Sequence, residues 1–184
     1  MALNGDFCTY RKDGVIIRQG QLFRNSPSER QSLIVDMKGD LHIVPERQMT
    51  SDGWLERGII QAFSFGPALV VDGQTKEMPS DYIYGRWKLT EPRSAIGQLG
   101  ELHYLLAVVD GREPGYSEGI NFTGLAELMA SKGCKIAYNM DGGQSSTLFF
   151  NNKVINKVSN GGERTVSDVL FFATADTDVR RNPR

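Results

Sequence analysis

The stretch AYNMDGGQSSTLFFNNKVINKVSNGGERTVSDVLFFAT, from Ala137 to Thr174, carries the strongest pattern in the chain. A strand-like run, 135–140, ends at Asp141-Gly142-Gly143 and is followed by hydroxyl residues that include Ser145 and Ser146. Two glycines at a strand end allow positive φ and a close approach of the backbone to a ligand. Asn139 and Asp141 add an amide and a carboxylate, so the segment predicts a site for a sugar or a phosphate.

A second glycine-rich loop, Gly161-Gly162-Glu163-Arg164, adds another carboxylate and a guanidinium. Upstream, a helix is expected from an N-cap at Thr123 to a stop at Gly133. It joins the strand 102–109 to the strand that ends at Asp141. If these strands are parallel neighbours, the Asp110-Gly111-Arg112 loop and the Asp141 loop emerge at one edge of the sheet, where such folds bind ligands.

Turn signals are dense along the rest of the chain and predict mostly hairpins. One hairpin is expected around Lys38-Gly39-Asp40 and another around Asn151-Asn152-Lys153, because Gly and Asn tolerate positive φ. A second, shorter helix is possible around 52–62. The predicted fold class is α+β: a twisted mixed β-sheet core with one or two packed helices, in a single domain over residues 1–184.

Composition excludes several classes of function. A formal charge of −1 over 184 residues argues against a nucleic acid polymer as partner. No apolar run approaches the roughly 20 residues that span a bilayer, so no membrane partner is expected. Met1 leads directly into a motif without a signal peptide, so the chain as written would stay in the cytoplasm, while its compartment stays open. The cysteines Cys8 and Cys134 are expected to be free thiols without metal spacing.

Histidine-based chemistry is disfavoured, because His42 and His103 both lie inside strand-like runs away from the serines. Glycosidic bond cleavage instead uses pairs of carboxyl groups. The candidate catalytic residues are Asp6, Asp110, Asp141 and Glu163. The candidate substrate-binding residues are Arg93, Arg112, Arg164, Asn139, Gly142, Gly143, Ser145 and Ser146. Aspartates and the Asn139 carbonyl also suit Ca²⁺ or Mg²⁺, so a divalent cation stays open although no cofactor is required.

The segment Asn139–Thr147 resembles the N-L-D-G-G-G-S-S-T motif of the phosphodiester glycosidases related to the mannose 6-phosphate uncovering enzyme, an N-acetylglucosamine-1-phosphodiester alpha-N-acetylglucosaminidase. The segment Glu163–Ser167 matches their E-R-x-V-S motif. Further matches, in family order, are Asn4–Phe7, Gly66-Pro67 with Leu69, Pro92–Gly97, and Asp110–Arg112 with Tyr116, Ser117 and Gly119. Two departures are Gln144 in place of the third glycine and a start at the first motif, without the family's usual N-terminal region.

The resemblance implies a hydrolase that cleaves a sugar-1-phosphodiester and releases free sugar. The phosphate leaves as an anion, so arginines that stabilise its charge replace a general acid. Asp141 and Glu163 would act at the anomeric centre, and Arg93 and Arg112 would converge on the phosphate. The alternative is a module that binds or sequesters a sugar phosphate or nucleotide-derived ligand without turnover, since Gln144 places a side chain, and an awkward backbone angle, where the family has glycine.

The start of the chain leads to a structural expectation. Residues 4–7 should end a strand inside the main sheet, with Asp6 turned toward the Asp141 loop. Because the family's preceding strands are missing, this edge of the sheet would expose unpaired backbone groups. Either a second copy in a homo-oligomer or a rearranged local loop must cover this edge, and the homo-oligomer is favoured.

Overall fold

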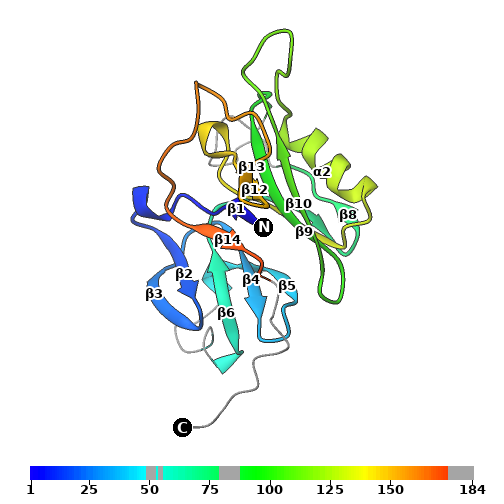
Figure 1. Ribbon diagram of the computed structural model, residues 1–184. Helices are drawn as coiled ribbons and strands as arrows, with labels where there is room; N and C mark the ends of the chain where they lie inside the picture. The colour runs from blue at the N-terminus through cyan, green and yellow to red at the C-terminus, as the bar shows by residue number, and fades with distance from the viewer. Residues whose placement is uncertain (49–52, 54–55, 79–87, 174–184) are drawn as a thin grey trace, which may run out of the picture.

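The protein is described by a computed structural model over residues 1–48, 53, 56–78 and 88–173 (Figure 1). This part of the chain is mostly β, with three sheets and the helix α2 (Phe122–Ser131). Every strand pairing within it is antiparallel, so the mixed sheet expected from the sequence is wrong. Among the described residues, no helix has the length and apolar character needed to cross a bilayer.

The strands fall into three sheets. The first has the order β10-β9-β11-β7-β8, made of β7 (Ala68–Val71), β8 (Gln74–Thr75), β9 (Arg93–Gly100), β10 (His103–Val109) and β11 (Ile136–Asn139). The second has the order β3-β2-β6-β4-β5, made of β2 (Gly14–Arg18), β3 (Gln21–Ser26), β4 (Gln31–Asp36), β5 (Leu41–Pro45) and β6 (Ile59–Phe63). The third has the order β13-β12-β1-β14, made of β1 (Ala2–Asn4), β12 (Leu148–Phe150), β13 (Lys153–Val154) and β14 (Val169–Phe171). Short 3₁₀ turns complete the set: η1 (Cys8–Tyr10), η2 (Glu46–Gln48) and η3 (Gly143–Ser145).

The four-stranded sheet lies between the two five-stranded sheets in Figure 1, and one apolar core joins all three. Leu3 of β1, Phe63 of β6 and Tyr138 of β11 are almost fully buried in that core. The Tyr138 hydroxyl donates to the Gln31 carbonyl (2.8 Å) and accepts from the Phe65 N–H (2.8 Å), so its polar group is satisfied inside the core. The three sheets therefore form one packed unit.

Helix α2 covers one face of the β10-β9-β11-β7-β8 sheet (Figure 1). It buries Phe122, Leu125, Ala126 and Met129, and the last three pack on Leu69, Val70 and Ala137. Its N-cap is Asn121, which accepts from the Gly124 N–H at 2.8 Å, so the cap expected at Thr123 is wrong by two residues. Gly133, at φ +87°, follows the C-cap Lys132 and ends the helix as predicted.

Strands β10 and β11 run in the same direction but are not neighbours. Strand β9 lies between them and pairs antiparallel with both, which corrects the expected strand–helix–strand unit. Two antiparallel steps restore the original direction, so the Asp110 and Asp141 loops still leave the sheet at the same end. The two loops therefore lie at one end of the sheet, as expected for a site, but strand β9 separates the strands that carry them.

Both predicted hairpins are present. Strands β4 and β5 pair around 37–40, and β12 and β13 pair around Asn151 and Asn152, at φ +47° and +63°. The second helix is wrong over its later part, because Ile59–Phe63 is strand β6 with buried Ile59, Ala62 and Phe63. Trp54 and Leu55, on which that helix also depended, lie outside the described residues.

Strand β1 is an inner strand rather than an exposed edge. It pairs with β12 on one side and with β14 on the other. It also belongs to the four-stranded sheet and not to the sheet that carries Asp141. The open edge from which a homo-oligomer was expected does not exist, because later segments of the same chain cover it. The homo-oligomer stays a prediction, but an exposed sheet edge no longer supports it.

Candidate active site

The Asp141 loop is fixed by the start of the chain. The Asp141 N–H donates to the Gly5 carbonyl (3.1 Å), and the Asn4 side chain donates to the Asp141 carbonyl (2.7 Å). Asn4 also accepts through Oδ1 from the Ser94 hydroxyl (2.7 Å) and the Thr147 N–H (3.2 Å). One buried amide thus ties β1 to β9 and to both ends of the Asp141 loop.

The Asp141 carboxylate is largely removed from water. Burial raises its pKa above the ordinary value, while the Ser145 side chain, the Gly142 N–H and the charges of Arg164 and Arg11 oppose that shift. The Gly142 N–H donates to Oδ1 at 2.9 Å and fixes the orientation of the group. A desolvated carboxylate at a strand end is the arrangement expected of a reacting group and not of a solvated turn residue.

Both glycines after Asp141 are required by close approach. A Cβ on Gly142 would lie 2.8 Å from the Pro92 carbonyl oxygen. Gly143 has φ +64°, and a Cβ there would lie 3.1 Å from Nη2 of Arg112. The glycine backbone therefore lets the Arg112 guanidinium lie directly beside the Asp141 loop.

Gly143→Ala is expected to lower substrate affinity, because its Cβ displaces the Arg112 guanidinium. Gly73→Ala is the matched control, since Gly73 has φ +76° and a Cβ there would meet no described atom within 4 Å. Both variants should lose about 1–2 kcal/mol of stability in denaturant unfolding, because alanine is strained at positive φ. Only Gly143→Ala should also weaken binding of a sugar phosphodiester. Equal binding by the two variants would contradict the assigned contact.

A small hollow of about 180 Å³ opens beside the two glycines. Its lining consists of Asp141, Gly142, Gly143, Arg93, Arg112, Glu91, Phe65 and Phe122. Arg112 donates through Nε to Oε2 of Glu91 at 2.5 Å, and a third of its side chain is exposed. Glu91 is nearly buried, so it holds the guanidinium in place at the mouth of the hollow.

Arg93 lines the same hollow but is 7% exposed. Its Nε donates to the Ile120 carbonyl (3.2 Å) and its Nη2 to the Leu89 carbonyl (3.1 Å), while the guanidinium lies 4.0 Å from the centre of the Phe122 ring. Arg93 therefore has structural contacts of its own. Its convergence with Arg112 on one phosphate stays a prediction.

Glu163 lies in a different depression. A polar cleft of about 550 Å³ is lined by 111–113 on one side and by 156–163 on the other, and Glu163 and Arg112 both belong to its lining. Arg112 is thus shared by the cleft and the hollow, whereas Asp141 lines only the hollow. Arg164 is exposed and lies 5.6 Å from the Tyr10 ring centre. The structure does not place Glu163 and Asp141 in one cavity.

Asp110 has three hydrogen-bond donors around it. Oδ1 accepts from the Asn156 amide (3.0 Å), and Oδ2 accepts from the Lys157 N–H (3.0 Å) and the Tyr116 hydroxyl (2.9 Å). These bonds tie the loop after β10 to the segment after β13. The geometry favours a positioning role for Asp110 over the catalytic role expected from the sequence.

Asn139, Ser145 and Ser146 lie beneath the site and not on its surface. Each is at most 1% exposed, and none belongs to the lining of the hollow or the cleft. Asn139 donates to the Gly66 carbonyl at 2.8 Å, while its Oδ1 and the Ser146 hydroxyl have no hydrogen-bond partner among the described residues. Direct contact of these groups with a sugar would require the loop to move.

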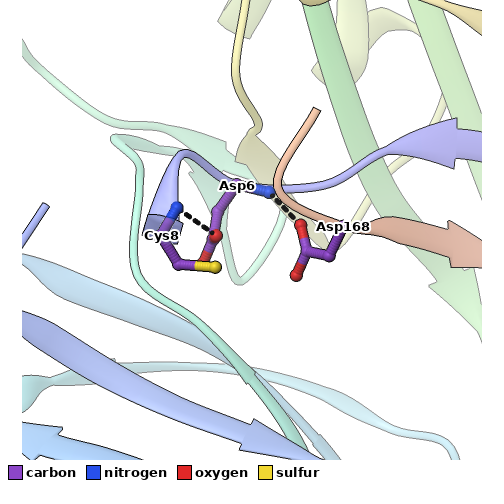
Figure 2. A group of neighbouring side chains, drawn as sticks. All are labelled: Asp6, Cys8 and Asp168. Carbon is purple, nitrogen blue, oxygen red and sulfur yellow. Dashed lines mark hydrogen bonds between the residues drawn. The ribbon is translucent and has the colours of Figure 1, made fainter. Parts of the chain in front are cut away.

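The Asp6 carboxylate is held by groups outside the Asp141 loop, and its expected turn toward that loop stays a prediction. Its Oδ1 accepts from the Cys8 N–H (2.9 Å) and its Oδ2 from the Ser64 N–H (3.0 Å) and from Arg18 (3.4 Å). Figure 2 shows the Asp6 N–H in turn donating to Asp168, at 3.0 Å. Arg18 donates to Asp168 through Nε at 2.8 Å and through Nη2. Burial, and next the charge of Asp6, raise the pKa of Asp168.

A possible metal site among the described residues is formed by Asp6, Cys8 and Asp168. Their potential ligand atoms all lie within 4.8 Å of one another (Figure 2). Burial raises the pKa of the Cys8 thiol to about 11, so the thiolate that a metal prefers is disfavoured. The Arg18 guanidinium already supplies the positive charge between the carboxylates. The residues fit a buried ion-pair cluster better than a metal centre, and the cofactor expectation stays untested.

The sequence reading missed four residues around the site. Glu91 and Arg11 flank the Asp141 hollow, and Arg18 and Asp168 form the ion-pair cluster behind it. None has a local pattern, since each gains its role through a partner far away in sequence. Neither His42, which pairs with Asp36 at 3.0 Å, nor His103 lines the hollow or the cleft.

Gln144, the departure from the glycine motif, has no strained backbone. It lies in the 3₁₀ turn η3 and is not among the residues with positive φ. Its Nε2 donates to the Gly162 carbonyl at 3.1 Å. The side chain thus joins the two glycine-rich loops, and the awkward backbone angle expected from the sequence is wrong.

These features define a mostly β protein with a glycine-lined candidate site at the loops of its sheets. The chain belongs to the phosphodiester glycosidase family, whose model matches residues 1–173.

The chain is also similar to a curated protein and to solved structures. It is 31% identical over 170 residues to an uncharacterised SPbeta prophage-derived protein, YomE, of Bacillus subtilis strain 168, covering 91% of this chain and 26% of that protein. The zebrafish N-acetylglucosamine-1-phosphodiester alpha-N-acetylglucosaminidase catalytic domain, auto-inhibited by its pro-peptide, aligns with a TM-score of 0.74 at 24% identity. That alignment covers 91% of this chain and 61% of the zebrafish chain. A hypothetical protein from Synechocystis aligns with a TM-score of 0.56 at 14% identity, over 90% of this chain and 50% of that one.

Both solved structures are less than 25% identical to this chain, so the likeness to them shows a shared fold alone. The chain spans about a quarter of the curated relative that it matches and about three fifths of the zebrafish domain.

Proposed function

We propose that this chain hydrolyses the glycosidic bond of a sugar-1-phosphodiester. Water adds to the anomeric carbon, the bond from that carbon to the phosphate oxygen breaks, and the products are free sugar and a phosphomonoester. The observation that carries the proposal is the hollow of about 180 Å³ that Asp141 and Arg112 line together, with the Arg112 guanidinium beside Gly143. Family membership supports the reaction class.

The two side chains suit the two ends of the breaking bond. Arg112 carries a fixed positive charge and is partly exposed, so it can receive the negative phosphate as the bond breaks. Because the leaving group is already an anion, no general acid is needed. Asp141 is the carboxylate available in the hollow to activate water or to stabilise positive charge on the sugar ring.

The non-catalytic alternative also has an observation in its favour. Glycosidases commonly use two carboxylates near the reacting carbon. Here Glu163 lies in the neighbouring cleft, and Glu91 in the hollow is paired with Arg112. Incubation with a sugar-1-phosphodiester of known composition separates the two readings: release of free sugar supports the enzyme, and recovery of intact bound ligand supports a sequestering module.

Arg112→Gln is expected to weaken binding of the phosphodiester by about 10- to 100-fold, since one charged hydrogen bond contributes roughly 1.5–3 kcal/mol. Calorimetric titration with the phosphodiester measures this loss. The neutral methyl glycoside of the same sugar is the control ligand, and its affinity should be the same for both proteins. Equal losses for both ligands would indicate a collapsed site instead of a lost phosphate contact.

A further inference from the structure

Arg11 is a charged side chain near the site that the reaction described above does not use. It directly follows η1, and its Nη2 donates to the Ser64 carbonyl. Its guanidinium carbon lies 5.3 Å from the centre of the Phe65 ring, and Phe65 lines the hollow that contains Asp141. The Phe65 N–H is in turn fixed by the buried Tyr138 hydroxyl at 2.8 Å. Arg11 therefore rests on a rigid support beside the hollow.

The remaining donors of Arg11 are sealed from water. Nε and Nη1 are buried and have no hydrogen-bond partner among the described residues. A buried guanidinium with unpaired donors is costly, so its retention calls for an electrostatic role. Asp13, an acid near Arg11 in sequence, is already held by Arg30 at 2.7 Å. Within the described part of the chain, the positive charge of Arg11 is thus left without an ion-pair partner.

Asp141 is the carboxylate on which this charge can act. Burial raises the pKa of Asp141, whereas the Ser145 side chain, the Gly142 N–H and the charges of Arg164 and Arg11 oppose that shift. Arg112, Arg93 and Glu91 line the same hollow, and Glu91 neutralises Arg112. Arg164 is exposed, so solvent and salt screen its charge, whereas Nε and Nη1 of Arg11 are buried and its charge is screened less.

We infer that Arg11 is a positioning residue that keeps the Asp141 carboxylate ionised through its buried, unpaired guanidinium. The inference rests on the proposed function for its purpose, because a water-activating or charge-stabilising Asp141 must be ionised. Its physical content is independent of turnover. It states that the Arg11 charge favours the ionised form of the Asp141 carboxylate.

The test is a carboxyl ¹³C NMR titration of Asp141 in the wild type, Arg11→Gln, Arg11→Lys and Arg24→Gln. Removing the Arg11 charge should move the midpoint to higher pH, since a nearby opposite charge favours the ionised acid. Arg11→Lys keeps the charge and should stay near the wild type. Arg24 also anchors this loop, donating to the Cys8 and Asp13 carbonyls at 3.1 Å, but it does not line the hollow that contains Asp141. Arg24→Gln should therefore leave the midpoint unchanged.

An unchanged midpoint in Arg11→Gln, or an equal shift in Arg24→Gln, would overturn the inference, because loop anchoring would then explain everything. The titration needs no substrate, so it decides the inference even if the chain proves to hydrolyse nothing. Where the wild type is active, the low-pH limb of kcat/KM for a sugar phosphodiester should follow the same order. A uniform loss of activity without displacement of that limb would again contradict the inference.

Discussion

Asp141→Asn is expected to lower hydrolysis of a sugar-1-phosphodiester by at least about 100-fold and to raise the free energy of unfolding at neutral pH. Positioned acid–base groups contribute roughly 10²- to 10⁴-fold to a rate, which sets the size of the loss. The asparagine keeps an oxygen that accepts from the Gly142 N–H, so the loop is retained. Steady-state kinetics and denaturant unfolding measure the two effects.

The gain in stability follows from the direction of the pKa shift. Burial raises the pKa of Asp141 in the folded protein above its ordinary 3.8. As pH rises above 3.8, the unfolded chain loses this proton first, which favours unfolding until the folded-state pKa is passed. Asparagine has no proton to lose. The advantage of the variant is therefore present at neutral pH and disappears as pH falls toward 3.8.

Asp72→Asn is the matched control, because Asp72-Gly73 is an exposed Asp-Gly turn after β7. It should change neither the rate nor the stability. An Asp141→Asn variant with near-normal turnover would remove Asp141 from the chemistry. A variant that is less stable than the wild type at neutral pH would contradict the desolvation of this carboxylate.

Arg18→Met is expected to lower the free energy of unfolding by about 3 kcal/mol, at the low end of the roughly 3–5 kcal/mol for a broken buried ion pair. The low end applies because a fifth of the Arg18 side chain is exposed. The substitution leaves the Asp6 and Asp168 carboxylates together without their cation, and Met keeps much of the contact with the Phe63 ring, now 4.1 Å from the guanidinium carbon. Urea unfolding at neutral pH measures the loss.

The loss should shrink as pH falls. Burial and the charge of Asp6 already raise the pKa of Asp168, and removing Arg18 raises it further. Protonation of Asp168 then relieves the repulsion in the folded state, so the variant recovers stability on acidification. Arg47→Met is the control, since Arg47 pairs with Glu29 on the surface and should lose at most about 1 kcal/mol. Equal losses for the two arginines would mean that the cluster is solvated.

The fold could be predicted from sequence wherever the signal was local. The β12–β13 turn follows from Asn151 and Asn152, and the stop of α2 follows from Gly133. Strand β9 was missed because Arg93, Ser94 and Gln98 are polar, which is atypical of a central strand. Their side chains are satisfied by distant groups, as when Ser94 donates to Asn4 and Gln98 accepts from the Leu41 N–H. No local pattern reveals such partners.

In the candidate site, too, only the residues with a local sequence pattern could be predicted. The Asp141 loop could be located because its glycines are needed for contacts with Pro92 and Arg112, and that need leaves a sequence pattern. The contacts of the Asp6 carboxylate could not be predicted, because one of its donors is the Ser64 N–H, 58 residues away. Glu91 and Arg11 likewise owe their places to Arg112 and to Phe65. Roles that arise from tertiary contacts could not be predicted from the sequence.

Hydrolysis of a sugar-1-phosphodiester in H₂¹⁸O, followed by mass spectrometry of both products, tests the central claim most directly. Cleavage between the anomeric carbon and the phosphate oxygen places ¹⁸O in the released sugar and none in the phosphomonoester, which is the result expected for water activated beside Asp141. Label in the phosphate would mean attack at phosphorus and would contradict a glycosidase. Recovery of unlabelled, intact phosphodiester would contradict turnover altogether.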